Sequence, residues 1–151
     1  MALARAAAVF GKPIPGARYW RRAGAYAVIP DGTGRVAMAR HKGQLHLPGG
    51  GLDAGETHDA GLLREVREET GLVVAVDRWF AEAEEYAWSE SLGPFLKAGR
   101  FALARVVEHA SEPLSGHELV WATLAEVERE VVGPSQAWAV ATGLRLVEED
   151  P

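Results

Sequence analysis

The chain of 151 residues contains no cysteine. Disulfide bonds, thiolate metal sites and cysteine nucleophiles are therefore excluded, and the fold needs no covalent cross-link from an oxidising compartment. No apolar run approaches the roughly 20 residues of a membrane-spanning helix. The apolar stretch near the start is also too short for a secretory signal. These absences predict a cytoplasmic protein with no membrane partner.

Basic residues are outnumbered as well: 16 lysines and arginines face 21 aspartates and glutamates, a formal net charge of -5. Proteins that hold a nucleic-acid backbone need basic stripes, so no nucleic-acid polymer is expected as a partner. A small anionic substrate remains compatible with this charge, because a bound metal ion reverses the local field.

The length and the hydrophobic fraction of 48% fit one globular domain. Glycine and proline are concentrated in residues 11–16, which predicts a turn-rich link. We therefore divide the chain into an N-terminal extension, residues 1–17, and a single domain, residues 18–151. The extension is expected to be a frayed end or an edge strand.

Hydrophobic periodicity predicts a mixture of strands and helices, and hence an α/β or α+β fold. Strands are expected over residues 19–30, 35–40, 45–47, 73–88, 100–107 and 119–122. Helices are expected over residues 58–70, 123–132 and 135–149. Residues 49–57 and 89–99 are interpreted as loops. Thr57 is the expected N-cap of the first helix, and Gly71 suits its C-terminal end.

The first helix carries a cluster of acids. Glu65, Glu68 and Glu69 are spaced i, i+3 and i+4, so they share one face, while Leu62 and Val66 fall on a neighbouring face that can pack on a sheet. One interpretation is a solvated surface of good helix formers. The other is a cation site, because clustered carboxylates repel one another and Mg²⁺ and Mn²⁺ prefer oxygen ligands.

The segment from Gly50 to Leu72 reads GGLDAGETHDAGLLREVREETGL, and it resembles the Nudix box at every specified position. The fixed residues are a glycine, a glutamate, an Arg-Glu pair, a Glu-Glu pair and a final glycine. The resemblance extends over most of the chain from about residue 18. It implies a Nudix-type α/β/α sandwich with a mixed β-sheet flanked by helices.

The resemblance also implies roles for the box residues. The metal ligands would be the Gly49 carbonyl, Glu65, Glu68 and Glu69, and the ion would be Mg²⁺ or Mn²⁺. The catalytic residues would be Glu65, Glu69 and Glu118, with Glu65 and Glu118 as rival general bases. Glu118 could equally be a plain loop carboxylate.

The remaining box residues would support its geometry: Gly50, Glu56, Arg64 and Gly71. Glu56 and Arg64 resemble the pair that fixes the loop to the helix in this family. Their substitution is expected to reduce activity through geometry rather than through direct chemistry.

Candidate substrate-binding residues are more weakly indicated. Three are basic and could meet phosphates, namely Arg22, Arg40 and Lys97, although isolated basic residues are usually solvated. Three others lie on one predicted strand and share a face if the strand is regular, namely Glu84, Tyr86 and Trp88. Aromatic residues mostly fill cores, which is the competing interpretation for these.

The resemblance predicts an enzyme that cleaves a phosphoanhydride bond in a nucleoside diphosphate linked to another moiety. The proline expected downstream of the box in many ADP-ribose hydrolases is missing near Ala87. A small single domain favours a nucleoside triphosphate or similar nucleotide. The alternative is a non-catalytic module of the same fold that senses a nucleotide. A homodimer is compatible with the family.

Overall fold

The computed structural model describes residues 6–149 of the chain. Eight strands and three helices follow one another in the order β1 (Ala6–Phe10), β2 (Trp20–Val28), β3 (Arg35–His41), β4 (Gln44–His46), β5 (Gly49–Gly51), α1 (His58–Thr70), β6 (Leu72–Ser89), β7 (Gly93–His109), β8 (His117–Thr123), α2 (Leu124–Glu130) and α3 (Pro134–Glu149).

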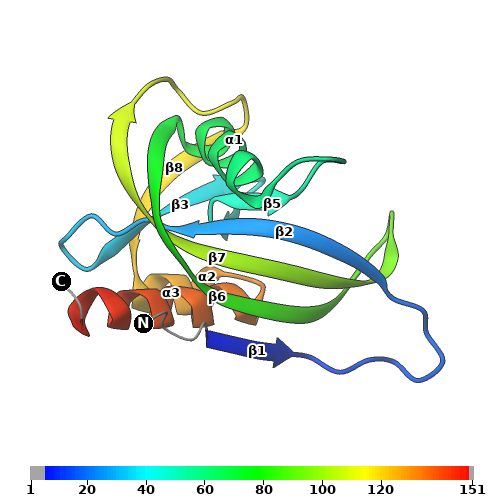
Figure 1. The fold of residues 1–151 in the computed structure, drawn as a ribbon. Helices are drawn as coiled ribbons and strands as arrows, with labels where there is room; N and C mark the ends of the chain where they lie inside the picture. Colours follow the sequence, from blue (N-terminus) through cyan, green and yellow to red (C-terminus); the bar gives the residue numbers. More distant parts are fainter. Residues whose placement is uncertain (1–5, 150–151) are drawn as a thin grey trace.

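The strands form two sheets. The larger sheet has the order β1-β6-β7-β2-β5, and the smaller one has the order β4-β3-β8. The larger sheet is mixed, because β1 and β2 pair in parallel with β6 and β7, whereas β6 pairs antiparallel with β7. Helix α1 lies on one side of this sheet and α2 and α3 lie on the other (Figure 1). The predicted α/β/α sandwich is therefore confirmed.

Each side of the large sheet has its own core. On the α1 side, Leu62 and Val66 pack with small residues of β2 and β7, including Ala27 and Ala102. On the α3 side, larger side chains fill the space, namely Val28, Phe80, Phe101, Leu103, Val127 and Val140, all below 9% exposed. Alanines on one face and larger residues on the other let α1 approach the sheet closely.

Helix α1 begins and ends where the sequence predicts. The Thr57 side chain accepts a hydrogen bond from the backbone N–H of Ala60, and Gly71 has a φ of 77°. A side chain at Gly71 would also collide with the Ser111 carbonyl, because a Cβ there would lie 2.0 Å from that oxygen. Both caps are thus fixed by local chemistry, and they set the register of the carboxylates along the helix.

Two predicted loops are wrong. Residues 89–99 were expected to form a loop, but β7 begins at Gly93 and pairs with both β6 and β2. Residues 49–51 were expected to open a loop, but they form β5 at the edge of the large sheet. Both segments contain glycines, which lower the strand propensity that can be read from the sequence. In the structure, hydrogen bonding to neighbouring strands outweighs this low propensity.

The N-terminal segment includes the expected edge strand. Strand β1 pairs in parallel with residues 81–85 of β6. This part of the predicted extension is thus built into the large sheet, and the division at residue 18 stays a prediction. Residues 1–5 of that extension lie outside the described residues.

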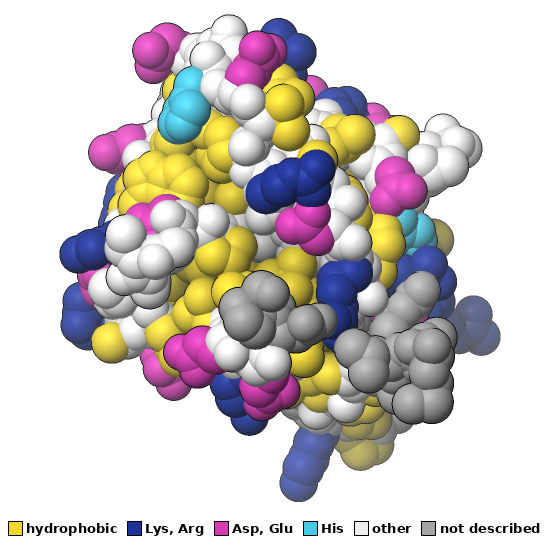
Figure 2. Space-filling view, turned by 60° about the vertical axis from the view of Figure 1, so that its left-hand side comes forward, with side chains coloured by type: hydrophobic (Ala, Val, Ile, Leu, Met, Phe, Trp, Pro, Cys, Tyr) yellow, Lys and Arg dark blue, Asp and Glu magenta, His cyan; other side chains and the backbone are white. Residues whose placement is uncertain are grey.

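Among residues 6–149, no helix has both the length and the apolar character needed to cross a membrane. On the face shown in Figure 2, basic and acidic side chains are interspersed around apolar ones. The absence of a nucleic-acid partner, the cytoplasmic location and the homodimer stay predictions.

Candidate active site

Arg64 holds the box together. Its guanidinium group forms a bidentate salt bridge with Glu56, in which Nε donates to Oε2 at 2.7 Å and Nη2 donates to Oε1 at 2.9 Å. Nη1 reaches Glu65 at 3.2 Å and Glu68 at 3.3 Å, and Nη2 lies 3.4 Å from Asp53. One arginine therefore ties the loop before α1 to two of the three clustered glutamates on the helix.

Glu56 is the partner that fixes this arrangement. The Arg64 hydrogen bonds, helped by the Asp53 backbone N–H, lower the pKa of Glu56 from 4.5 to about 2. A carboxylate with such a low pKa keeps its charge in the physiological range. The geometry agrees with the supporting role predicted for Glu56 and Arg64, and that role itself stays a prediction.

Glu69 lies deepest of the three glutamates, with only 8% of its surface exposed. Its Oε1 accepts a hydrogen bond of 2.7 Å from the backbone N–H of Gly49. Gly49 has a φ of 142°, and a Cβ there would lie 2.2 Å from the Ala25 carbonyl oxygen. The site therefore requires glycine at this position, because only glycine allows β5 to approach β2 and still present its amide to Glu69.

The buried carboxylates are short of positive charge. Burial, followed by repulsion from Glu65 and Glu68, raises the pKa of Glu69 to about 8, although the Gly49 hydrogen bond opposes the shift. Burial also raises the pKa of Glu65, against the opposing effect of Arg64. A site whose acids resist ionisation for lack of a counter-charge is suited to a cation.

The raised pKa of Glu69 predicts an inverted pH dependence of folding. Between roughly pH 4.5 and 8 the folded chain keeps a proton that the unfolded chain has lost, so this group's contribution to the free energy of unfolding falls as pH rises. We expect the Tm of the protein in EDTA to fall more between these pH values than the Tm of Glu69→Gln, which cannot ionise. Parallel Tm profiles would contradict the assignment.

His46 faces the same carboxylate. Its Nδ1 lies 2.9 Å from the Leu47 carbonyl, which can only accept, so Nδ1 carries the proton in the neutral ring. Burial lowers the pKa of His46, which favours that neutral ring. Nε2 then presents a lone pair 3.8 Å from Glu69 Oε2. No sequence pattern singles out His46, although it lies three residues before Gly49.

The fit of a metal ion rests on the donors present. Within residues 6–149, no three acidic or imidazole side chains form a ready-made metal cluster. The donor chemistry nevertheless suits Mg²⁺ or Mn²⁺, since Glu65, Glu68 and Glu69 offer hard oxygen atoms on one helix face. The poorly compensated burial of Glu69 is the observation that a cation would relieve.

Glu118 lies apart from the Arg64 network. It is exposed on β8, opposite Arg40 of β3. It lines a hollow together with Thr70 and His109, and Thr70 is the residue after Glu69 at the end of α1. The structure thus places Glu118 near the C-terminal end of the helix, and its role as a general base stays a prediction.

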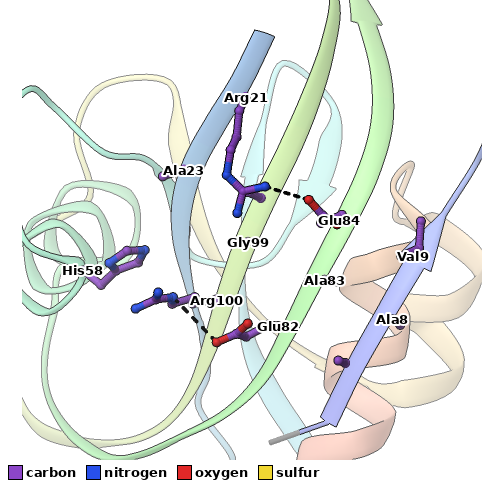
Figure 3. A pocket seen from close by; sticks show the side chains of 12 residues that line it. Ala8, Val9, Arg21, Ala23, His58, Glu82, Ala83, Glu84, Gly99 and Arg100 are labelled. Carbon is purple, nitrogen blue, oxygen red and sulfur yellow. Dashed lines mark hydrogen bonds and ion pairs between the residues drawn. The ribbon is translucent and has the colours of Figure 1, made fainter. Parts of the chain in front are cut away.

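The predicted substrate residues of β6 lie on the α1 side of the large sheet. Glu84 forms an ion pair with Arg21 at 2.7 Å and lines an open hollow there (Figure 3). The register pairs Tyr86 and Trp88 with residues 96 and 94, so alternation puts both aromatics on the face of Glu84. The structure does bring these three residues to one face, as the sequence predicts.

The predicted basic residues separate into two groups. Arg40 forms an ion pair with Glu130 of α2 at 3.3 Å. Arg22 and Lys97 instead line a pocket on the α3 side of the sheet, next to Gly51 of β5. The structure therefore brings Arg22 and Lys97 together, while Arg40 is engaged elsewhere.

Several residues of that pocket were missed by the sequence analysis: Ala23, Tyr26, Ser89, Ser91, Leu92 and Phe95. The alternation of β2 could have placed Tyr26 on the same face as Arg22. The other pocket residues could not be found, because most of them lie in the segment interpreted as a loop.

Comparison with known proteins gives one family. The NUDIX domain matches residues 20–141. No curated protein matches the chain.

Solved structures share the fold at low sequence identity. A NUDIX hydrolase from Nitrosomonas europaea has a TM-score of 0.68 and 18% identity, over 80% of this chain and 86% of that one. An ADP-ribose pyrophosphatase from Streptococcus suis has a TM-score of 0.66 and 18% identity, over 86% and 94%. A MutT protein from Methanosarcina mazei Go1 has a TM-score of 0.64 and 19% identity, over 90% and 100%.

Proposed function

This chain belongs to the NUDIX domain family, and on that premise we propose that it uses divalent metal ions to hydrolyse a phosphoanhydride bond in a nucleotide. As a family member with a complete box it is a Nudix-type pyrophosphohydrolase. The proposal concerns the metal, the roles of the residues and the substrate. The ion would be Mg²⁺ or Mn²⁺.

The observation that carries the proposal is the Glu69 carboxylate. It is buried, it is hydrogen-bonded to the Gly49 amide at 2.7 Å, and its pKa is raised to about 8. A structural carboxylate would gain nothing from such a position, since burying a poorly paired acid costs free energy. A cation held by Glu65, Glu68, Glu69 and the Gly49 carbonyl would offset that cost.

A divalent ion at this position would neutralise phosphate charge and acidify a water molecule. The residues of the chain would do the rest. Gly49 orients Glu69 through its amide, and Arg64, anchored by Glu56, orients Glu65 and Glu68. Glu65, whose pKa burial raises, is the group that we propose accepts the proton of the attacking water. Glu118 is the competing base.

The substrate that we favour is a nucleoside triphosphate or a similar nucleotide. The pocket beside the box measures about 370 Å³, which is within the range of small-molecule sites. It offers two basic side chains near the box, together with apolar Leu92 in the turn between β6 and β7 and Phe95 near the start of β7. These features suit a compact molecule with an anionic end and a less polar end.

The proposal is tested with a substrate panel. Purified protein would be incubated with Mg²⁺ or Mn²⁺ and nucleoside triphosphates, ADP-ribose or diadenosine polyphosphates, and the products identified by mass. We expect cleavage of a nucleoside triphosphate that EDTA abolishes and added metal restores. Binding of a nucleotide without any cleavage would favour the sensing module instead.

A further inference from the structure

Two cations of the pocket beside Gly51, Arg22 and Lys97, belong to a row of charged residues that crosses three strands. The register places Glu85 of β6 opposite Lys97, and Lys97 of β7 opposite Arg22 of β2. Neighbouring strands lie about 4.8 Å apart, so the three side chains start side by side on one face of the sheet. Two cations are thus direct cross-strand neighbours, an arrangement that is unfavourable unless something neutralises it.

The acid in this row is already engaged. Glu85 Oε1 accepts a hydrogen bond of 3.0 Å from the backbone N–H of Ser135, in the first turn of α3. It still attracts Lys97, but burial dominates and lowers the pKa of Lys97. Within the described residues no carboxylate lies within 4.0 Å of the Lys97 ammonium group.

The Lys97 ammonium group is instead held over an aromatic ring. Nζ lies 4.6 Å from the centre of the Tyr26 ring, which is only 7% exposed. A cation–π contact fixes the position of an ammonium group but leaves its N–H donors free. Burial raises the pKa of Tyr26, and the nearby negative charges of Glu69 and Glu65 raise it further, so the ring lies close to the box. Lys97 is thus held next to the box.

Arg22 packs against Gly51 in the same pocket. A Cβ at Gly51 would lie 2.5 Å from Arg22 Nε, so the guanidinium group fills the space that the missing side chain leaves beside β5. Its neighbour Arg21 points to the other face and is neutralised by Glu84 at 2.7 Å (Figure 3). No carboxylate within the described part of the chain forms an ion pair with Arg22. The cation on one face is paired, and the two cations in the pocket are not.

We propose that Lys97, with Arg22 beside it, is the specificity-determining residue for the polyphosphate portion of the substrate. The pair would bind a phosphate that the box carboxylates do not reach, while Leu92 and Phe95 receive the less polar end. The inference rests on the proposed function, because it places this phosphate next to the box. It selects substrates whose phosphate chain ends in a free terminal phosphate over those whose diphosphate is capped by a second sugar.

The test is binding of inorganic tripolyphosphate in EDTA at low salt, measured by calorimetry, so that no turnover is needed. We expect the native protein to bind, and Lys97→Met to bind about 10- to 100-fold more weakly, since a hydrogen bond to a charged group contributes about 1.5–3 kcal/mol. Lys97→Arg should retain most of the affinity. Arg21→Gln, the matched control on the opposite face, should bind like the native protein.

Equal affinities for the native protein and Lys97→Met would overturn the inference, as would a native protein that does not bind tripolyphosphate. Both outcomes are read from variants whose Tm matches the native value, and Arg22→Gln, which neutralises the other cation of the pocket and should also weaken binding, serves if Lys97→Met is unstable. The result is separable from the proposed function. If the chain binds tripolyphosphate through Lys97 but cleaves no nucleotide, the phosphate-binding role of Lys97 stands and the proposed hydrolysis is contradicted.

Discussion

Glu69→Gln is expected to reduce kcat by at least about 10³-fold in saturating Mg²⁺. Stabilisation of transition-state charge by a metal ion contributes several kcal/mol, and each 1.36 kcal/mol corresponds to a factor of ten in rate. Glutamine keeps an oxygen for the Gly49 amide but removes the charge that a cation needs. The rate is measured on whichever nucleotide the substrate panel identifies.

The same variant should fold at least as well as the native chain. Glu69 is 8% exposed and its pKa is about 8, so replacing it with a neutral amide removes a buried, poorly compensated acid. Glu128→Gln, an exposed acid of α2, is the matched control and should leave both rate and Tm unchanged. Native-like turnover by Glu69→Gln would remove the central ligand from the proposed site.

Gly49→Ala is expected to lower the free energy of unfolding by roughly 3–5 kcal/mol. The backbone φ of 142° strains any L side chain, and the new Cβ would lie 2.2 Å from the Ala25 carbonyl oxygen and 2.7 Å from Tyr26 Cα. Strain and overlap each contribute about 1–3 kcal/mol. For a chain of this size the loss corresponds to a fall in Tm of roughly 6–20 °C.

Gly32→Ala separates the two contributions. Gly32 has a φ of 84°, but no heavy atom lies within 4 Å of a Cβ built there. This variant should lose about 1 kcal/mol, because it carries the backbone strain alone. Equal losses for the two variants, measured by thermal unfolding, would show that the close approach of β5 to β2 does not constrain Gly49.

Helix α1 could be predicted from the sequence because its determinants are local. Thr57 and Gly71 mark its ends, and the spacing of Glu65, Glu68 and Glu69 fixes their common face. The supporting contacts of Arg64 follow from the box, which is a short contiguous segment. The resemblance adds the fold that surrounds this helix, and the structure confirms that fold.

The substrate pocket could not be predicted, because it depends on which strands pair. Arg22 and Lys97 are 75 positions apart, and they become neighbours only through the parallel pairing of β2 with β7. Lys97 lies in a segment that was expected to be a loop, so the sequence could not assign its side chain to either face of a sheet. Parallel pairing between distant segments leaves no local signal, so Arg40 and Lys97 looked equally plausible.

Alternation was more informative within a single strand. It correctly placed Glu84, Tyr86 and Trp88 on one face of β6. What it could not show is that this face lies on the opposite side of the sheet from Lys97. Sequence patterns therefore predicted groups of residues, and the pairing of strands decided which groups share a pocket.

The most direct test of the central claim is hydrolysis in water labelled with heavy oxygen, with Mg²⁺ present and the phosphate products identified by mass. We expect the label in one phosphate-containing product of the native protein, and none with EDTA or with Glu69→Gln. That result would place water on phosphorus at a metal-dependent site. A native protein that leaves every nucleotide unlabelled and uncleaved would contradict the account and make the chain a binding module.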